Sequence, residues 1–309
     1  MSKYAHNVVS KDEQNTPWFK ILNWIGDKPK VLDVGCSSGY FGEKLIEARQ
    51  ATVWGVDLDE EDAAAAKKRG YQDVLVGDLD SFDWKRLGSK KFDAIIFADV
   101  LEHVKDPLAN VVAASKLLAP GGFIYTSIPN VAHITVRTEL MEGNFDYEST
   151  GLLDNTHIRF FTKKTVQKLF YDAGLEVVHF DSTTNDISDG QVRDHLKRMG
   201  LTPTSAFDDV LASQEARTFQ YIVGARIPKN KASLKTPKLL KQSGKLHDDW
   251  PLIEKTMKEN SKTIERLQQE NTQLHGELDV LRNRIRDIKR NPAKWVAKKV
   301  YHRVKKRRG

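Results

Sequence analysis

The sequence predicts an α/β protein with a Rossmann-like, doubly wound sheet, followed by an α-helical coiled coil. Short apolar runs alternate with helix-like segments up to about residue 226, which is typical of parallel strands covered by helices on both faces. Several of these runs end in or beside an aspartate. Beyond residue 250, apolar residues recur at spacings of three and four, which predicts the coiled coil.

The strands in the first half of the sheet are predicted from apolar runs that lie between residues typical of turns. Thr16 and Pro17 predict the start of a first helix, because Pro favours the first helical position. We expect helices at 17–25, 40–48, 60–68 and 108–118, and strands at 30–34, 52–56, 73–76, 92–98 and 123–128. The last of these strands follows a Pro-Gly-Gly turn. Five strands in roughly 100 residues indicate a doubly wound core.

Two insertions interrupt the second half of the domain. Residues 129–161 are polar and rich in aromatics, and such long insertions are often functional. A helix at 163–173 and a strand at 175–180 resume the pattern, and a strand at 219–225 closes it. Between them, residues 183–217 contain helix-like stretches to which the sequence assigns no purpose.

Composition divides the chain into four predicted parts. Residues 1–226 form the domain, 227–249 a Lys-rich linker, 250–291 the coiled coil and 292–309 a basic amphipathic tail. The single cysteine, Cys36, excludes a disulfide framework and favours a reducing compartment. Because we find no long apolar run and no signal-peptide pattern, we expect a cytoplasmic protein.

The predicted rod carries its apolar residues without a break in spacing, with Asn260 and Asn271 in place of two of them. Its apolar positions are Ile253, Met257, Ile264, Leu267, Leu274, Leu278, Leu281, Ile285 and Ile288. About five heptads predict a homo-oligomer, either dimer or trimer. The alternative is one amphipathic helix packed on the domain.

The positive charge of the chain is concentrated in the tail. Residues 292–309 contain eight Lys/Arg and no Asp or Glu, so of the total charge of +7 they contribute +8 and residues 1–291 about −1. This excludes a strongly basic core and argues against nucleic-acid binding by the domain. Val296, Val300 and Val304 form an apolar stripe that favours an anionic membrane surface as partner. A solvated tail, or one that binds nucleic acid nonspecifically, is the alternative.

The stretch VLDVGCSSGYFG at 31–42 joins the first predicted strand to a helix through a glycine-bearing turn. Its glycines, Gly35, Gly39 and Gly42, fit neither the G-x-G-x-x-G dinucleotide pattern nor the P-loop, and no lysine follows. The turn from Asp33 to Gly39, followed by Asp57, resembles class I S-adenosylmethionine-dependent methyltransferases. The resemblance implies a seven-stranded sheet with an antiparallel last strand, and S-adenosyl-L-methionine as cofactor. A Rossmann-like domain for another ligand is the alternative.

The resemblance assigns cofactor contacts to the ends of successive strands. Asp33 would orient the loop and the amino end of the cofactor, Asp57 would accept the ribose hydroxyls, and Asp78 would reach the adenine amino group. The glycines would permit close approach of the backbone to the ligand. The full predicted set is Asp33, Gly35, Cys36, Gly39, Asp57, Leu58, Asp78, Leu79 and Asp99. No residues are assigned to a metal.

Candidates for catalysis follow the fourth strand and lie in the first insertion. The stretch FADVLEHVKDP contains Asp99, Glu102 and His103, and His103 is a candidate base, or else a group that holds the loop or touches the cofactor. The stretch DNTHIRFFT contains His157 and Arg159 beside two phenylalanines, a set that suits an anionic, ring-bearing acceptor. His133, Arg137, Phe145 and Tyr147 lie upstream. Alternatively, His157 and Arg159 only fix the insertion to the core.

The order of PN and H-x-R-F-F-T resembles sugar-modifying methyltransferases of bacterial polysaccharide pathways. With the rod and tail, the chain is similar to chain-terminating methyltransferases of O-antigen synthesis. That resemblance implies O-methylation of a lipid-linked polysaccharide, a glycosyltransferase partner and a peripheral position on the inner face of the cell membrane. Two rivals stay open: a small-molecule methyltransferase acting on a quinone-type precursor, and a scaffold without activity.

Overall fold

A computed structural model describes residues 13–185 and 187–230, together with Gln273. The predictions of a coiled coil and a basic tail therefore lie outside the described residues, apart from that single position, and stay predictions. None of the helices in the described part of the chain has the length and apolar character needed to cross a bilayer.

Seven strands form one sheet in the order β3-β2-β1-β4-β5-β7-β6. The pairs β1–β2, β2–β3, β1–β4 and β4–β5 are parallel, whereas β7 is antiparallel to both β5 and β6. This confirms the doubly wound sheet with an antiparallel last strand. The strands are β1 (Lys30–Val34), β2 (Thr52–Asp57), β3 (Asp73–Val76), β4 (Phe92–Ala98), β5 (Leu118–Pro129), β6 (Glu176–Thr184) and β7 (Thr218–Arg226).

The strand order reverses between β1 and β4, because the chain runs outward from β1 to β3 and then returns to β4 on the other side. In open sheets of this kind, ligands bind outside the carboxyl ends of the strands at such a switch point. The loops after β1 and β4 are therefore the first place to look for a site.

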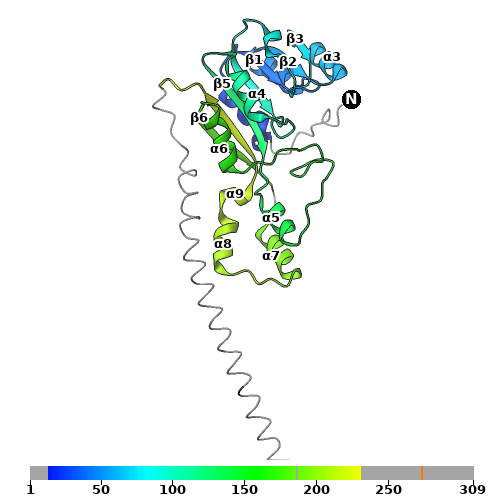
Figure 1. Cartoon of the computed structure of the whole chain (residues 1–309), viewed down its shortest axis with the longest axis vertical. Helices are drawn as coiled ribbons and strands as arrows, with labels where there is room; N and C mark the ends of the chain where they lie inside the picture. Colours follow the sequence, from blue (N-terminus) through cyan, green and yellow to red (C-terminus); the bar gives the residue numbers. More distant parts are fainter. Residues whose placement is uncertain (1–12, 186, 231–272, 274–309) are drawn as a thin grey trace, which may run out of the picture. The chain divides into compact units, whose positions relative to one another are not determined.

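Helices cover both faces of the sheet (Figure 1). The helices α1 (Pro17–Trp24), α2 (Tyr40–Arg49) and α3 (Glu60–Lys68) share one apolar core with alternate residues of β1, β2 and β4. The helices α4 (Pro107–Ser115) and α6 (Lys163–Asp172) share the second core with the remaining residues of the same strands. Strands buried on both faces explain the nearly continuous apolar runs in the sequence. The described residues also form two short 3₁₀ helices, η1 (Glu13–Asn15) and η2 (Trp84–Leu87).

The predicted helix at 108–118 was too long. Helix α4 ends at Ser115, and Leu118 already pairs with Phe92 in the sheet. The Pro-Gly-Gly turn lies within β5 at a shift of register, where a Cβ on Gly122 would come within 2.8 Å of the Phe92 carbonyl oxygen. Glycine therefore lets β5 start before the turn rather than after it.

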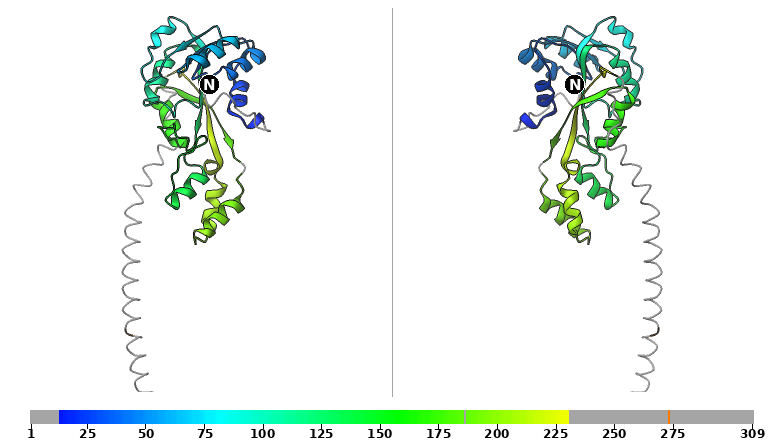
Figure 2. Two further views of the ribbon diagram at one scale, coloured as in Figure 1. Left: turned by 90° about the vertical axis from the view of Figure 1, so that its right-hand side faces the viewer. Right: turned by 90° about the vertical axis from the view of Figure 1, so that its left-hand side faces the viewer.

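The two insertions pack on each other and build a separate small core. Helix α5 (Ile134–Met141) follows β5, and α7 (Asp189–Arg198), α8 (Ser205–Ala212) and α9 (Gln214–Arg217) lie between β6 and β7. Their shared buried residues are Ile134, Val192, Leu196, Leu211 and Ala216. Figures 1 and 2 show these helices gathered beyond one end of the sheet. That end is the carboxyl edge of β5, so the insertion at 183–217, unexplained by sequence, supports the segment nearest to the expected site.

Candidate active site

The loop after β1 folds back onto β2. The backbone N–H groups of Gly35 and Cys36 both donate to the carbonyl oxygen of Val56, at 2.7 and 3.2 Å. Gly35, Ser37 and Gly39 have φ values of 70°, 47° and 86°, in the left-handed region. Ser37 is strained there, because a side chain disfavours this conformation. The loop is thus held in one specific shape.

The glycines of this loop make room for neighbouring protein atoms, and the expected close approach of their backbone to a ligand stays a prediction. A Cβ on Gly35 would lie 2.5 Å from Val100 Cγ2. A Cβ on Gly39 would lie 2.7 Å from the Cα of Ala66 and 3.0 Å from the ring of Tyr71. Both contacts are shorter than van der Waals distance, so glycine is required even before a cofactor binds.

Asp33 acts on this loop through Tyr71. The Tyr71 hydroxyl donates to Asp33 Oδ2 at 2.6 Å and accepts from the N–H of Gly42 at 3.1 Å. Asp33 is 2% exposed, and burial raises its pKa to about 6, an effect that the Tyr71 hydrogen bond opposes and the nearby Asp57 adds to. Asp33 thus holds the first turn of α2 through Tyr71, and its roles toward the loop and the cofactor stay predictions.

Asp57 ends β2 with its carboxylate fixed in place. Its Oδ2 accepts from Ser37 N at 2.6 Å and its Oδ1 from Asp59 N at 3.0 Å. Burial raises its pKa and these N–H donors oppose the rise. A carboxylate offers about four acceptor positions, so two more donors, such as ribose hydroxyls, can still bind. The adjacent Leu58 is 71% exposed and is open to a ring.

The remaining predicted cofactor residues fall into two groups. Asp78 is exposed, and its Oδ1 accepts from Asp80 N at 2.9 Å, while Leu79 is half-buried beside it. Cys36, by contrast, is 6% exposed with its thiol in the core, so only its backbone could meet a ligand. Burial also raises the pKa of this thiol far above its usual range. A rigid loop, a fixed carboxylate and an exposed apolar side chain fit the cofactor that the resemblance implies.

Asp99 follows β4 in a strained conformation, with a φ of 53°. Its Oδ1 accepts from the Ser127 hydroxyl at 2.8 Å and from the Gln220 side-chain amide at 2.7 Å, and its N–H donates to Ser127 Oγ at 3.0 Å. Asp99 is accessible to solvent, yet desolvation by the surrounding protein raises its pKa. Side chains of β5 and β7 therefore fix this carboxylate at the carboxyl end of β4.

Ser127 and Gln220 were not predicted from the sequence. Ser127 is an ordinary strand residue in sequence terms, although its place near the carboxyl end of β5 was a usable signal. Gln220 reaches the same edge only because β7 runs antiparallel to β5, with Gln220 opposite Pro129. No local sequence pattern predicts the antiparallel pairing of β7 with β5.

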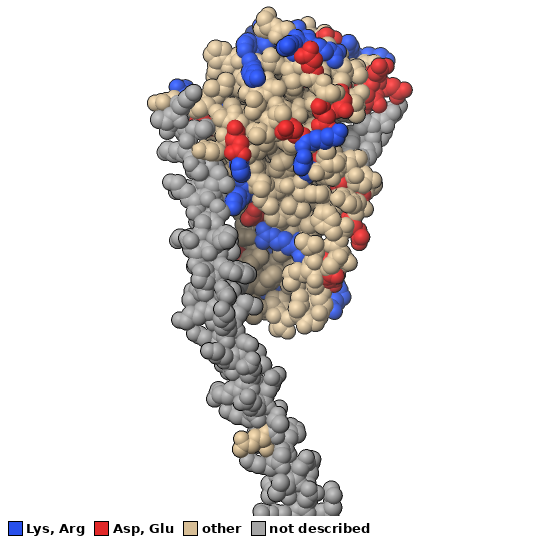
Figure 3. Space-filling view, in the orientation of Figure 1, with Lys and Arg blue, Asp and Glu red and all other residues tan. Residues whose placement is uncertain are grey.

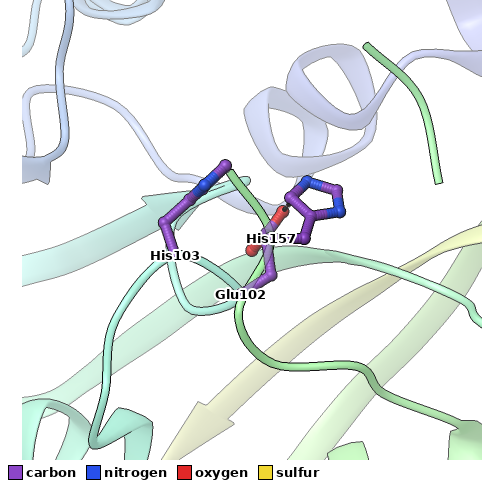
Figure 4. Close-up of side chains that lie close together, drawn as sticks. All are labelled: Glu102, His103 and His157. Atoms are coloured by element: carbon purple, nitrogen blue, oxygen red, sulfur yellow. Dashed lines mark ion pairs between the residues drawn. The ribbon is translucent and has the colours of Figure 1, made fainter. Parts of the chain in front are cut away.

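Glu102, His103 and His157 lie together next to this edge, and we call them the Glu-His cluster (Figure 4). Glu102 and His103 belong to the loop after β4, and His157 comes from the first insertion. The two imidazole rings lie 4.8 Å apart between centroids, and His157 Nε2 lies 3.9 Å from Glu102 Oε1. The structure therefore brings together His103 and His157 with Glu102, which the sequence named among the candidates without a specific role.

The Glu-His cluster is mostly buried. Glu102 is 1% exposed, and burial, with Asp99 and Asp154 nearby, raises its pKa well above its usual range. Burial also lowers the pKa of His103, against the opposing hydrogen bond to the Thr156 carbonyl. Neither carboxylate oxygen of Glu102 has a hydrogen-bond partner among the residues described.

Arg159 holds the insertion against the loop after β4. Its guanidinium donates through Nε and a terminal nitrogen to the Lys105 carbonyl oxygen, the Nε contact at 3.0 Å. The N–H groups of Ile158 and Arg159 both donate to the Glu102 carbonyl oxygen, at 2.9 and 3.0 Å. The geometry gives Arg159 a structural role, and its contact with an acceptor stays a prediction.

Three aromatic residues of the first insertion, two before His157 and one after it, form a group. Phe145, Tyr147 and Phe160 contact one another, with ring centroids 5.5 to 6.5 Å apart, and Tyr147 is 56% exposed. His133, in contrast, is fully buried at the start of α5 and accepts from Thr135 N. His133 is therefore a structural residue in this conformation, while the aromatic group is open to a ligand.

The two halves of the insertion motif form one structural unit. Asn130 forms an isolated bridge with Phe161, and Val131 N donates to the Phe161 carbonyl oxygen at 2.9 Å. The Asn130 side chain donates to the carbonyl oxygens of Glu215 and Thr218, both at 2.8 Å. On the face shown in Figure 3, charged side chains of both signs are interspersed with uncharged surface over the described residues.

Residues 14–180 match the family described as a methyltransferase domain. Among curated proteins, the chain is 25% identical over 195 residues to a ubiquinone biosynthesis O-methyltransferase of Thiobacillus denitrificans, covering 59% of this chain and 84% of that protein. It is 29% identical to the protein of the same name from Psychrobacter arcticus, over 68% of this chain and 78% of that one. The match to the Pseudomonas aeruginosa PAO1 protein of that name is 30% identical, over 41% of this chain and 59% of the relative.

The chain also matches solved structures, at lower identity. A putative methyltransferase from Bacillus halodurans is 16% identical, with 70% of this chain and 100% of that chain covered and a TM-score of 0.47. An S-adenosylmethionine-dependent methyltransferase from Mesorhizobium loti is 18% identical, with 68% and 98% covered and a TM-score of 0.46.

Proposed function

Since this chain belongs to the methyltransferase domain family and is an S-adenosylmethionine-dependent methyltransferase, we propose that it methylates a ring hydroxyl, in the first place a hydroxyl of a sugar. The observation that carries the choice of acceptor is the aromatic group of Phe145, Tyr147 and Phe160, in which Tyr147 is exposed and the two phenylalanines are half-buried. Phe160 is three residues after His157, so its Cα lies within about 10 Å of that of the histidine. Aromatic faces of this kind suit the apolar face of a ring.

The cofactor supplies a methyl group already activated by its sulfonium. The chain has to align that methyl with the acceptor and accommodate one proton. Asp57 and the loop after β1 hold the nucleoside end, through a carboxylate fixed by Ser37 and Asp59. Asp99, fixed by Ser127 and Gln220, lies between that half and the Glu-His cluster in chain order.

Two groups near the strand ends are suited to receive the acceptor proton. His103 donates from Nδ1 to the Thr156 carbonyl, which leaves Nε2 as the basic nitrogen. Its lowered pKa keeps the ring neutral near pH 7. Asp99 is the other group, because it is ionisable and accessible.

Our acceptor of choice is a sugar at the nonreducing end of a lipid-linked, O-antigen-type polysaccharide. The motif from Asn130 to Phe161 resembles that of sugar-modifying methyltransferases, and its two ends pair in the structure. The heptad pattern at 250–291 and the basic stripe at 292–309 support a glycosyltransferase partner, an oligomer and attachment to the inner face of the membrane.

A small hydroxylated ring, such as a quinone precursor, is the second candidate. The names of the curated relatives favour it, since each is described as a ubiquinone biosynthesis O-methyltransferase. An aromatic group serves a phenolic ring as well as a sugar. The third possibility, an inactive scaffold, is set aside by the family membership.

The test is methyl transfer from radiolabelled cofactor by the full-length protein, with membranes of the producing cell as acceptor. We expect label in long glycan, lost in Asp57→Ala, retained in Asp83→Ala and reduced when residues 292–309 are deleted. Asp83 is a fair control because it also accepts a backbone N–H, from Lys85. Label in a small lipid would replace the sugar by the second candidate.

A further inference from the structure

The Glu-His cluster combines three potential metal ligands at one point. One ligand atom from each of Glu102, His103 and His157 lies within 4.8 Å of the other two. Figure 4 shows the three side chains gathered around the same space, two from the loop after β4 and one from the first insertion. Glu102 and His157 are 1% and 7% exposed, so the group is enclosed by protein.

Glu102 is the first reason to look for a ligand here. Its two carboxylate oxygens are buried and have no hydrogen-bond partner among the described residues. In that part of the chain the one side chain within ion-pair range is His157, whose Nε2 is 3.9 Å away, too far for a hydrogen bond. A buried carboxylate without partners is costly, and a bound cation removes that cost.

The orientation of the two histidines is the second, independent reason. His103 Nδ1 lies 3.1 Å from the Thr156 carbonyl oxygen, and His157 Nδ1 lies 3.1 Å from that of Leu152. A carbonyl oxygen only accepts, so both Nδ1 atoms carry the hydrogen and both Nε2 atoms carry the lone pair. Histidines that ligate metals are typically fixed in this way by a backbone carbonyl.

We propose that Glu102, His103 and His157 bind a divalent transition-metal ion and that its open coordination positions receive the acceptor hydroxyl. The second half rests on the proposed function. Two imidazoles and one carboxylate suit Zn²⁺, Mn²⁺, Co²⁺ or Fe²⁺, whereas Mg²⁺ and Ca²⁺ prefer oxygen ligands alone. Bond lengths of about 2.1 Å require the ligand atoms to approach by roughly 1 Å, which side-chain rotation supplies.

The ion would lower the pKa of the bound hydroxyl, as it does for bound water. The O–H bond then breaks, the proton leaves to solvent water, and the oxygen keeps the electron pair. That pair forms the new bond to the methyl carbon while the carbon–sulfur bond breaks, and the sulfur departs as a neutral thioether. When Nε2 of His103 binds the metal ion, that nitrogen can no longer accept the acceptor's proton. In this proposal His103 is therefore a metal ligand and not the base.

A second set of acid and histidine residues provides a matched control. Glu139, Glu142 and His195 also bring ligand atoms within 4.8 Å of one another. Both carboxylates there are exposed and reach water, so they lack the buried, unpartnered acid of the Glu-His cluster. Binding at that set instead would show as sensitivity to Glu142→Gln.

The experiment uses metal-stripped, full-length protein without cofactor or acceptor, titrated with Mn²⁺, Co²⁺ or Zn²⁺ alone by calorimetry. We expect one ion to bind, at least about tenfold more weakly in Glu102→Gln and unchanged in Glu142→Gln. The melting temperature without metal should not fall in Glu102→Gln, because an unpaired buried charge is removed, whereas its rise on adding metal should vanish.

Relaxation of water protons by bound Mn²⁺ tests the open positions independently of any acceptor. A strong enhancement is expected, and its absence would mean a closed site and would overturn the acceptor role. No binding to the wild type, binding unchanged in Glu102→Gln, or binding lost in Glu142→Gln would overturn the site itself. Metal binding with no methylation of glycan would leave the site standing and count against the sugar proposal alone.

Discussion

The loop after β1 and the loop after β4 lie at the same switch point, yet they satisfy their acidic groups differently. Around the first, the carboxylates of Asp33 and Asp57 both accept hydrogen bonds from the protein. Around the second, Glu102 is buried without a hydrogen-bond partner in the described residues. The first loop is therefore complete before its ligand binds, and the second is completed by what it binds.

Substituting Gly39 tests the packing of the first loop and should have the largest effect. Gly39→Ala should cost about 4 kcal/mol in the free energy of unfolding, because the new Cβ meets Ala66 at 2.7 Å and φ is 86°. Gly143→Ala is the matched control, with a φ of 84° and no atom within 4 Å of the new Cβ. It should cost about 1 kcal/mol. Urea unfolding followed by tryptophan fluorescence measures both, and equal losses would show that backbone conformation alone requires glycine.

His133 lies in the first insertion, which packs against the loop after β4. Its protonation therefore tests how the stability of that insertion depends on pH. Burial, with Arg217 and Arg137 nearby, lowers its pKa from 6.5 to about 4, while Glu215 contacts Arg137 at 3.9 Å. Between pH 6.5 and pH 4 the His133 side chain binds a proton in the unfolded chain but not in the folded protein. The stability that depends on neutral His133 is therefore fully present above pH 6.5 and is lost as the pH falls toward 4. The loss should approach about 3 kcal/mol.

The measurement is the difference in unfolding free energy between the wild type and His133→Gln at several pH values. This difference removes the contributions of the other histidines. It should change by about 3 kcal/mol between pH 7 and pH 4, in the direction that favours the variant in acid. A difference that is constant with pH would mean that His133 can be protonated in the folded protein without cost.

Gln220 tests whether Asp99, which it holds at the start of the loop after β4, contributes to cofactor binding. Gln220→Met removes one of the two side-chain donors that fix Asp99 while keeping the shape of the side chain. We expect cofactor affinity to fall about fivefold, corresponding to about 1 kcal/mol, with the unfolding free energy unchanged. The same change at the exposed Gln72 should have no effect. An unchanged affinity in both would separate Asp99 from cofactor binding.

The sheet and the first loop could be predicted because their signals are local. Apolar runs gave the strands, and the span from Asp33 to Gly39 is continuous in sequence. The partners that fix those residues were not predictable, since Tyr71 reaches Asp33 across 38 positions and Gln220 reaches Asp99 across 121. The same holds for Glu102 and His157, which the insertion brings together through hydrogen bonds to the Glu102 carbonyl.

The central claim is that the cofactor half is complete without the Glu-His cluster. Calorimetric titration of metal-stripped protein with S-adenosylhomocysteine tests it most directly, in Asp57→Ala and Glu102→Gln side by side. We expect about 100-fold weaker binding in Asp57→Ala, since two hydrogen bonds to a charged group are lost, and wild-type binding in Glu102→Gln. Loss of binding in Glu102→Gln, or wild-type binding in Asp57→Ala, would contradict the account.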